Sequence, residues 1–310
     1  MACNNISPLG LIKGVYHTLK NKVMWFNLYR QTFKNYPSVI FNQTRMNFPL
    51  TAILKNNQQL KLNSIDETAL FALLTIHQNM NYDKKNDMLT VSLSSKFIRS
   101  SVRLFGIIQN TDTILAFSDN DGTYENLPLK DKTIIDIGAC TGDTSIYFAL
   151  KGAKKIIAVE PFPTNFEILK KNIKENKFTE QIIPILGACG YLKKEILIDP
   201  NLHDGMRSIL HEFPDGIKIS AITLEDIIKD FDVSNAILKL DCEGCEYETI
   251  LNSSSEILQK FTDIQIEYHN GYKNLEKKLL SVGFEVSHAV IDNMNRGHIH
   301  AKKNLDIFDE

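Results

Sequence analysis

Residues 136–143 read Asp-Ile-Gly-Ala-Cys-Thr-Gly-Asp and connect an apolar run, Thr133–Ile137, to a segment with helical periodicity, Thr144–Leu150. The apolar run is short and rich in β-branched residues, which is typical of a buried strand. Glycine at positions 138 and 142 permits a tight turn and a close backbone approach to a ligand, and the following helix offers unpaired N–H groups. The stretch therefore predicts a ligand-binding turn between a strand and a helix.

Strand-like and helix-like segments alternate from this point to about residue 283. Helical periodicity is found at Thr144–Leu150, at Phe166 with Leu169 and Ile173, after a capping box of Thr223 and Asp226, and at Glu246–Leu251 and Leu275–Leu280. Strands are predicted at Thr133–Ile137, Lys155–Val159, Gln181–Leu186, Lys218–Ile222, Ala236–Leu240 and Ile264–Tyr268. The alternation predicts an α/β fold with a mainly parallel sheet, helices on both faces and a ligand site beyond the carboxyl ends of the strands.

The first 120 residues have a different pattern, so we expect an N-terminal α+β region over 1–120 and the sheet domain over 121–310. A stripe of Leu11, Val15, Leu19 and Val23 predicts a first helix, and a second is expected after Asp66. Short strands are predicted at Ser38–Phe41, Thr51–Leu54, Leu60–Leu62, Met88–Leu93, Val102–Ile108 and Thr113–Phe117. This region has a possible role in substrate binding or interaction.

The composition is that of a folded globular chain: 43% of its 310 residues are hydrophobic and 23% are charged. The net charge of -2 gives no general basic excess, so we expect no nucleic-acid partner. The five cysteines do not suggest a disulfide framework. We see neither a signal peptide nor an apolar stretch long enough to span a membrane, which favours a cytoplasmic location. The oligomeric state is not indicated.

A second acid supports a nucleoside-like ligand. Glu160 ends the second predicted strand, where a carboxylate suits the hydroxyls of a ribose. A nicotinamide site would show G-x-G-x-x-G, whereas Gly138 and Gly142 form G-x-x-x-G with an acid on each side, which suits a cofactor carrying ammonium and sulfonium groups. The predicted cofactor site comprises Asp136, Gly138, Ala139, Cys140, Gly142, Asp143, Glu160, Pro161, Gly187 and Asp241.

An ordered set of motifs resembles the FkbM family of methyltransferases. The set runs from Asp136-Ile-Gly-Ala-Cys-Thr-Gly-Asp-Thr144 through Val159-Glu160-Pro161, Asn165 and Asn172, Lys239-Leu-Asp-Cys-Glu-Gly-Cys-Glu246 and Ile266-Glu-Tyr-His269. The resemblance covers about residues 132–283 and implies a Rossmann-like seven-stranded methyltransferase sheet with a final antiparallel strand. It also implies S-adenosylmethionine as the cofactor and transfer usually to a hydroxyl oxygen, so we expect a small molecule or glycan hydroxyl as substrate.

Four side chains are expected where the methyl group would emerge. Asp241 and Glu243 follow a buried strand, and Glu267 alternates onto one face of its strand with His269. We choose His269 as the base because its unperturbed pKa lies near neutrality, with Asp241 second and Glu267 beside them. A strand-end histidine satisfied by the backbone is the equal alternative on spacing alone. The same four groups suit a divalent cation such as magnesium or manganese, although the metal-free site is favoured.

Other interpretations remain open. An RNA or protein N-methyltransferase of the same fold is the second hypothesis, although Asp241-Cys-Glu-Gly stands where base N-methylation often uses Asn/Asp-Pro-Pro-aromatic. A non-catalytic module that binds the cofactor is the third. For Cys242 and Cys245, small buried residues are favoured over a redox or zinc pair. The N-terminal region and the segment Ile198–Pro214 are expected to shape the acceptor pocket.

Overall fold

The computed structural model describes residues 23–108, 110, 113–117, 123–190, 195–199, 216–292 and 296–304. The predicted stripe at Leu11, Val15 and Leu19 and nearly all of the 198–214 segment lie outside these ranges. Among the helices that the ranges contain, none combines the length and the apolar character needed to cross a bilayer.

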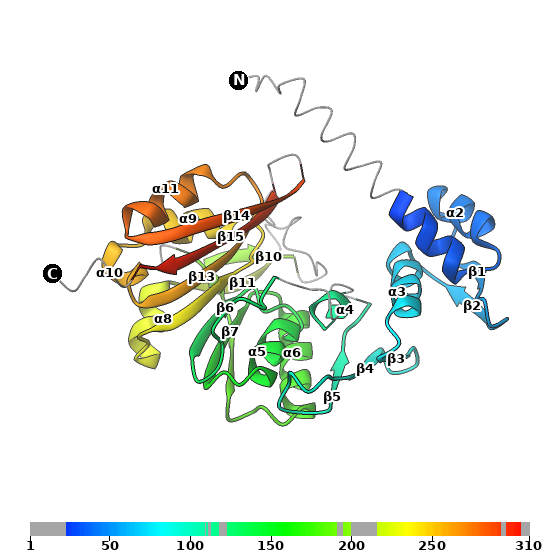
Figure 1. Cartoon of the computed structure of the whole chain (residues 1–310), viewed down its shortest axis with the longest axis horizontal. Coiled ribbons are helices and arrows are strands. Elements are labelled where there is room, and N and C mark those ends of the chain that lie inside the picture. The colour runs from blue at the N-terminus through cyan, green and yellow to red at the C-terminus, as the bar shows by residue number, and fades with distance from the viewer. Residues whose placement is uncertain are drawn as a thin grey trace, which may run out of the picture.

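The central sheet has seven strands in the order β14-β15-β13-β12-β6-β7-β8 (Figure 1). Its core is parallel from β13 to β8, whereas β15 runs antiparallel to both β13 and β14. The strands are β6 (Thr133–Ile137), β7 (Lys155–Glu160), β8 (Ile182–Leu186), β12 (Ala236–Leu240), β13 (Phe261–Tyr268), β14 (Phe284–Asp292) and β15 (Arg296–Lys303). The predicted α/β sheet with its final antiparallel strand is confirmed.

Helices cover both faces of the sheet because neighbouring residues in each strand point to opposite sides. Ile134 of β6 belongs to one hydrophobic cluster with α5 (Asp143–Leu150) and α6 (Pro163–Glu175). Its neighbour Ile135 belongs to a second cluster on the other side. The helices of that second layer are α8 (Leu224–Phe231), α9 (Cys245–Asn252), α10 (Ser255–Leu258) and α11 (Lys273–Ser281).

A small second sheet follows β8. Its strands are β9 (Ala188–Cys189), β10 (Glu195–Ile198) and β11 (Ile217–Ile222), in the order β10-β11-β9. The next helix, α8, begins with the predicted capping box, because the Thr223 hydroxyl accepts from the Asp226 amide and the Asp226 carboxylate accepts from the Thr223 amide.

The N-terminal part contains a hydrophobic cluster of its own, around Phe33. The cluster is formed by a helix over residues 23–32, α2 (Tyr36–Thr44), the hairpin of β1 (Leu50–Ile53) and β2 (Gln59–Leu62), and α3 (Ile65–Ile76). An antiparallel sheet of β3 (Met80–Asp83), β4 (Met88–Ser92) and β5 (Ser101–Phe105) instead shares the cluster of α5 and α6. The domain boundary at residue 120 stays a prediction.

Two predicted strands of the N-terminal part are helices. Ser38–Phe41 lies within α2, where Pro37 occupies the first turn and fixes a helical φ. A strand would place Val39 and Phe41 on one face, but Val39 is buried and Phe41 is 52% exposed. Thr113–Phe117 contains α4 (Thr113–Ala116), and Ile114 is buried together with Phe117, the residue that follows the helix. Strand β3 was not predicted.

Candidate functional site

The loop after β6 is fastened to the end of β7. The amides of Gly138 and Ala139 both donate to the Val159 carbonyl at 3.0 Å. The Cys140 amide donates to Glu160 Oε2, and the Phe162 amide donates to Glu160 Oε1, each at 2.9 Å. Glu160 thus joins two loops at adjacent strand ends, although it is only 3% exposed.

The same loop lies against the end of β12. Gly138 has a φ of 76°, and a Cβ on it would stand 1.7 Å from the Asp241 carbonyl oxygen. The Asp241 amide donates to the Ile137 carbonyl at 3.1 Å. Gly142, with a φ of 88°, would meet Leu169 Cδ1 at 2.5 Å in the same way. At Gly138 only glycine provides both the left-handed backbone and the space, as the sequence predicted for a tight turn, whereas the atom facing Gly142 is the end of a side chain.

Asp136 is completely buried beneath this loop. Its Oδ1 lies 3.0 Å from Lys239 Nζ, and its Oδ2 accepts from the hydroxyls of Thr144 and Ser145 at 2.7 and 2.6 Å. Burial opposes the charge of Lys239, but the carboxylates of Asp136 and Asp241 raise the pKa of the ammonium above its usual value. The Asp136 carboxylate therefore holds the loop and the start of α5 together.

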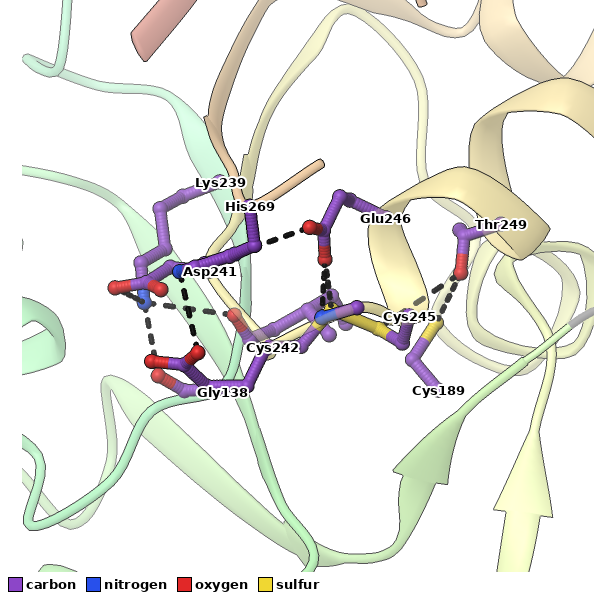
Figure 2. The surroundings of a disulfide bond; sticks show 12 residues. Gly138, Cys189, Lys239, Asp241, Cys242, Cys245, Glu246, Thr249 and His269 are labelled. Atoms are coloured by element: carbon purple, nitrogen blue, oxygen red, sulfur yellow. Dashed lines mark hydrogen bonds and ion pairs between the residues drawn. A yellow bond between two sulfur atoms is a disulfide. The ribbon is translucent and has the colours of Figure 1, made fainter. Parts of the chain in front are cut away.

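Lys239 had no role in the sequence-based site. The sequence feature that could have revealed its role is its position inside the otherwise apolar strand Ala236–Leu240. A lysine is almost never fully buried without a partner. Figure 2 shows its ammonium directed at the loop, where the Gly138 carbonyl accepts from it at 2.8 Å.

The remaining predicted cofactor residues lie at the same edge of the sheet. Gly187, after β8, donates its amide to the Glu160 carbonyl at 3.1 Å, and Pro161 follows Glu160 directly. Burial raises the pKa of Glu160 to about 7 and that of Asp143 to about 6. Burial also raises the pKa of the Cys140 thiol, which keeps this cysteine protonated. The structure thus brings all the residues of the predicted cofactor set to the ends of β6, β7, β8 and β12.

A second group of side chains surrounds His269, directly after β13. Its Nδ1 lies 3.0 Å from Glu246 Oε1, and its Nε2 lies 3.2 Å from Glu243 Oε2 and 3.8 Å from Glu267 Oε1. Burial lowers the pKa of His269, but the hydrogen bond with Glu246 and the charge of Glu243 outweigh it and raise the pKa to about 9. The ordinary pKa that favoured His269 as a base is therefore absent.

The alternation predicted for β13 is confirmed, because Ile266 and Tyr268 are fully buried while Glu267 is partly exposed. Burial, followed by the charge of Asp241, raises the pKa of Glu267 to about 7. Glu246 belongs to one of the family motifs, but the sequence analysis assigned it no role. It is fully buried beside His269. Figure 2 shows these side chains coming from three elements: Asp241 from the end of β12, Glu246 from α9 and His269 from the end of β13.

The expectation of unpaired small cysteines at 242 and 245 is wrong, because Cys242 and Cys245 form a disulfide. The two residues flank a sharp turn in which Glu243 has a φ of 56° and Gly244 a φ of 123°. This turn brings their Cα atoms to 5.5 Å, a usual separation for a disulfide. The spacing of the two cysteines does not reveal this turn, so the pairing could not be predicted from the sequence.

The strand order and the loop that joins Glu160 to residues 138–142 define the class of protein, which has a Rossmann-like methyltransferase fold. Residues 136–288 match the model of the methyltransferase FkbM domain. The chain is also 30% identical over 152 residues to "Uncharacterized protein 158B" of Sulfolobus islandicus rod-shaped virus 1, an alignment that covers 49% of this chain and 69% of that protein. The chain belongs to the FkbM methyltransferase family.

In two further matches, the aligned part is less than half of the other protein. The chain is 36% identical over 121 residues to the tRNA (guanine(37)-N(1))-methyltransferase Trm5b of Methanocaldococcus jannaschii. This alignment covers 36% of this chain and 34% of that protein. The crystal structure of methyltransferase FkbM from Methylobacillus flagellatus is 15% identical, with a TM-score of 0.42, over 60% of this chain and 47% of that one. The chain thus spans about a third of Trm5b and about half of the Methylobacillus protein.

Proposed function

We propose that this chain is an S-adenosylmethionine-dependent methyltransferase that acts on a hydroxyl oxygen of a small molecule or a glycan. The observation that carries the proposal is the junction at Glu160, whose carboxylate accepts one amide from each of two loops at the sheet's carboxyl edge. Oε1 also accepts from the Asn165 side-chain amide at 3.5 Å, whereas Oε2 keeps a second lone pair for a ribose hydroxyl. The acids at the edge of the loop suit the positive charges of the sulfonium and ammonium groups of the cofactor.

In this proposal Glu160 faces the ribose of the cofactor, and Asp143 faces its methionine part. Asp136 acts indirectly in this proposal: with Lys239 it holds the loop, including Gly138 and Cys140, in place. Because a sulfonium is already a good leaving group, positioning of donor and acceptor supplies much of the rate enhancement. The transferred methyl group leaves sulfur, whose electron pair stays behind, and bonds to the acceptor oxygen.

The acceptor hydroxyl is proposed to bind beside Asp241 and Glu267, whose carboxylates are 32% and 24% exposed at the edge of β12 and β13. A carboxylate there accepts the hydroxyl hydrogen and directs the oxygen lone pair at the methyl group. His269, held between Glu243 and Glu246, is a positioning residue in this arrangement.

RNA N-methylation is the second candidate, and the 36% identity with a tRNA methyltransferase favours it. Two features weigh against it: the net charge of -2 and the Asp241-Cys-Glu-Gly sequence at the end of β12. The aligned part covers only 34% of that relative, so its substrate is a hypothesis for this chain.

The test is incubation with donor labelled in its methyl carbon and a fractionated extract of the source cells. We expect label in the small-molecule or glycan fraction, bonded to oxygen by carbon NMR. Label in nuclease-sensitive material would replace the O-methylation proposal with the RNA one. Binding of the donor without release of label in any fraction would instead make the chain a non-catalytic binding module.

A further inference from the structure

We propose that Asp241, Glu243 and His269 bind one divalent cation at the carboxyl ends of β12 and β13. The residues offer a carboxylate oxygen each and one imidazole nitrogen, and these three atoms all lie within 4.8 Å of one another. Ligand bonds of about 2.0–2.3 Å place the ligands of a single ion roughly 3–4.5 Å apart. The cluster therefore has the size of a coordination shell before any side chain moves.

His269 has the environment of a metal ligand. Its side chain is 10% exposed, and its Nδ1 pairs with the fully buried carboxylate of Glu246 at 3.0 Å. Nε2 makes no hydrogen bond, although Glu243 Oε2 stands 3.2 Å away. A metal-binding histidine commonly donates its other ring N–H to a carboxylate, which turns the lone pair of the remaining nitrogen toward the ion.

The charge around Nε2 also favours a cation. Three carboxylates approach this point, those of Asp241, Glu243 and Glu267, and a fourth, that of Glu246, pairs with Nδ1 of the same ring. Lys239 Nζ lies 3.9 Å from Asp241 Oδ2 but only 3.0 Å from Asp136 Oδ1. The lysine therefore balances mainly the charge of Asp136. A proton on His269 supplies one positive charge, whereas a divalent cation supplies two and contacts three of the groups directly.

The backbone fixes the two carboxylate ligands. Asp241 is the first residue after β12, and Glu243 lies inside the ring closed by the Cys242–Cys245 disulfide. The Gly244 amide donates to Glu246 Oε2 at 2.8 Å, so the same buried acid holds both the turn and His269. Asp241 and Glu243 remain 32% and 28% exposed, which leaves one side of the ion open to water or a ligand.

One imidazole and two carboxylates suit manganese, because imidazole favours transition ions and carboxylates favour hard ones. The role of the ion in catalysis rests on the proposed function, whereas its binding does not. A cation at this edge would hold the acceptor oxygen and lower the pKa of its hydroxyl. The oxygen would then bond to the methyl carbon as the carbon–sulfur bond breaks, and the hydroxyl proton would pass to the Glu267 carboxylate.

The experiment is a Mn²⁺ titration of the full chain after treatment with a chelator, followed by electron paramagnetic resonance. We expect one bound ion per chain and a nitrogen coupling from His269 in the pulsed spectrum. Glu243→Gln and His269→Gln should each weaken binding at least tenfold, and His269→Gln should also remove the nitrogen coupling. Glu246→Gln should weaken binding by about 10- to 100-fold.

His300→Gln is the matched control, because His300 also pairs with a carboxylate, Asp263, at 3.1 Å on the same sheet but has no second acid within an ion's reach among the described residues. It should leave the Mn²⁺ affinity unchanged, and circular dichroism checks that every variant is folded. No binding by the wild-type chain at about millimolar Mn²⁺, or binding that survives both ligand substitutions, would overturn the site.

Donor binding and methyl release are measured on the same samples, with and without Mn²⁺. Full methyl release by chelator-treated enzyme would overturn the catalytic role of the ion while supporting the proposed function. Specific Mn²⁺ binding with no donor binding would support the metal site and contradict the proposed function.

Discussion

Asp136 and Lys239 form a buried ion pair whose side chains are 0% and 2% exposed. The pair connects β6 with β12, and through the Thr144 and Ser145 hydroxyls it also contacts the first turn of α5. A buried pair of this kind gains little net stability over apolar residues, but removal of one partner leaves an uncompensated charge. Its value here lies in the fixed position of the loop above it.

Lys239→Met should therefore destabilise the fold by about 3–5 kcal/mol, because Asp136 would be left charged and buried. The double variant Asp136→Asn with Lys239→Met should recover most of that loss. Urea unfolding of the wild type, both single variants and the double variant measures this coupling. A loss below about 1 kcal/mol for Lys239→Met would show that the pair is not electrostatically coupled.

The pH dependence of donor binding is a second prediction at this scale. Glu160, with a pKa of about 7, and Asp143, with a pKa of about 6, lose their protons as the pH rises through these values. The ionised forms attract a sulfonium, so affinity for S-adenosylmethionine should rise about three- to tenfold from about pH 5.5 to pH 7. Lys239 also lies in this region, and its raised pKa keeps the ammonium charged over the range.

S-adenosylhomocysteine is the control ligand, because it lacks the methyl group and the positive charge on sulfur but is otherwise the same molecule. Calorimetry at several pH values should give it a clearly flatter profile. Equal pH profiles for the two ligands would show that these carboxylates do not sense the charge on sulfur.

Among the loops of the sheet, the β6–α5 turn depends most directly on glycine. Gly138→Ala should cost at least about 3 kcal/mol of unfolding free energy, since the added Cβ meets a backbone oxygen that cannot move away. Gly152→Ala is the matched control: its φ of 90° is also left-handed, but the nearest atom is Lys130 Cγ at 3.6 Å. It should cost about 1–2 kcal/mol. Similar losses for both variants, measured by chemical denaturation, would contradict the close approach.

The elements of the central sheet could be predicted because their strands are buried on both faces and their helices carry regular apolar stripes. Thr133–Ile137 and Ala236–Leu240 have the predicted bounds. Short N-terminal elements were harder, because an apolar run of four or five residues fits a strand or one helical turn equally well. Tertiary contacts decide such cases: Asn172 of α6 pairs with both backbone groups of Phe105 in β5, which no local pattern reveals.

For the whole molecule, the sequence predicted the edge of the sheet at which the site lies, and the family resemblance supplied the likeness to methyltransferases. Motif spacing placed Asp136 and Glu160 at the ends of two strands, and the Cys140 amide in the loop after Asp136 donates to Glu160. The partners of individual side chains could not be predicted from motif spacing. Lys239 beneath the loop, Glu246 beside His269 and the Cys242–Cys245 disulfide all depend on how β12, β13 and α9 pack together.

The central claim is that the Glu160 junction binds S-adenosylmethionine, and calorimetric titration of the wild-type chain and Glu160→Gln tests it most directly. The wild type should bind one donor molecule per chain, and the variant should lose at least about tenfold in affinity, because an amide donor would replace one carboxylate oxygen facing the ribose. Circular dichroism must show that the variant is folded. No binding by the wild type, or equal affinity in the two folded proteins, would contradict the account.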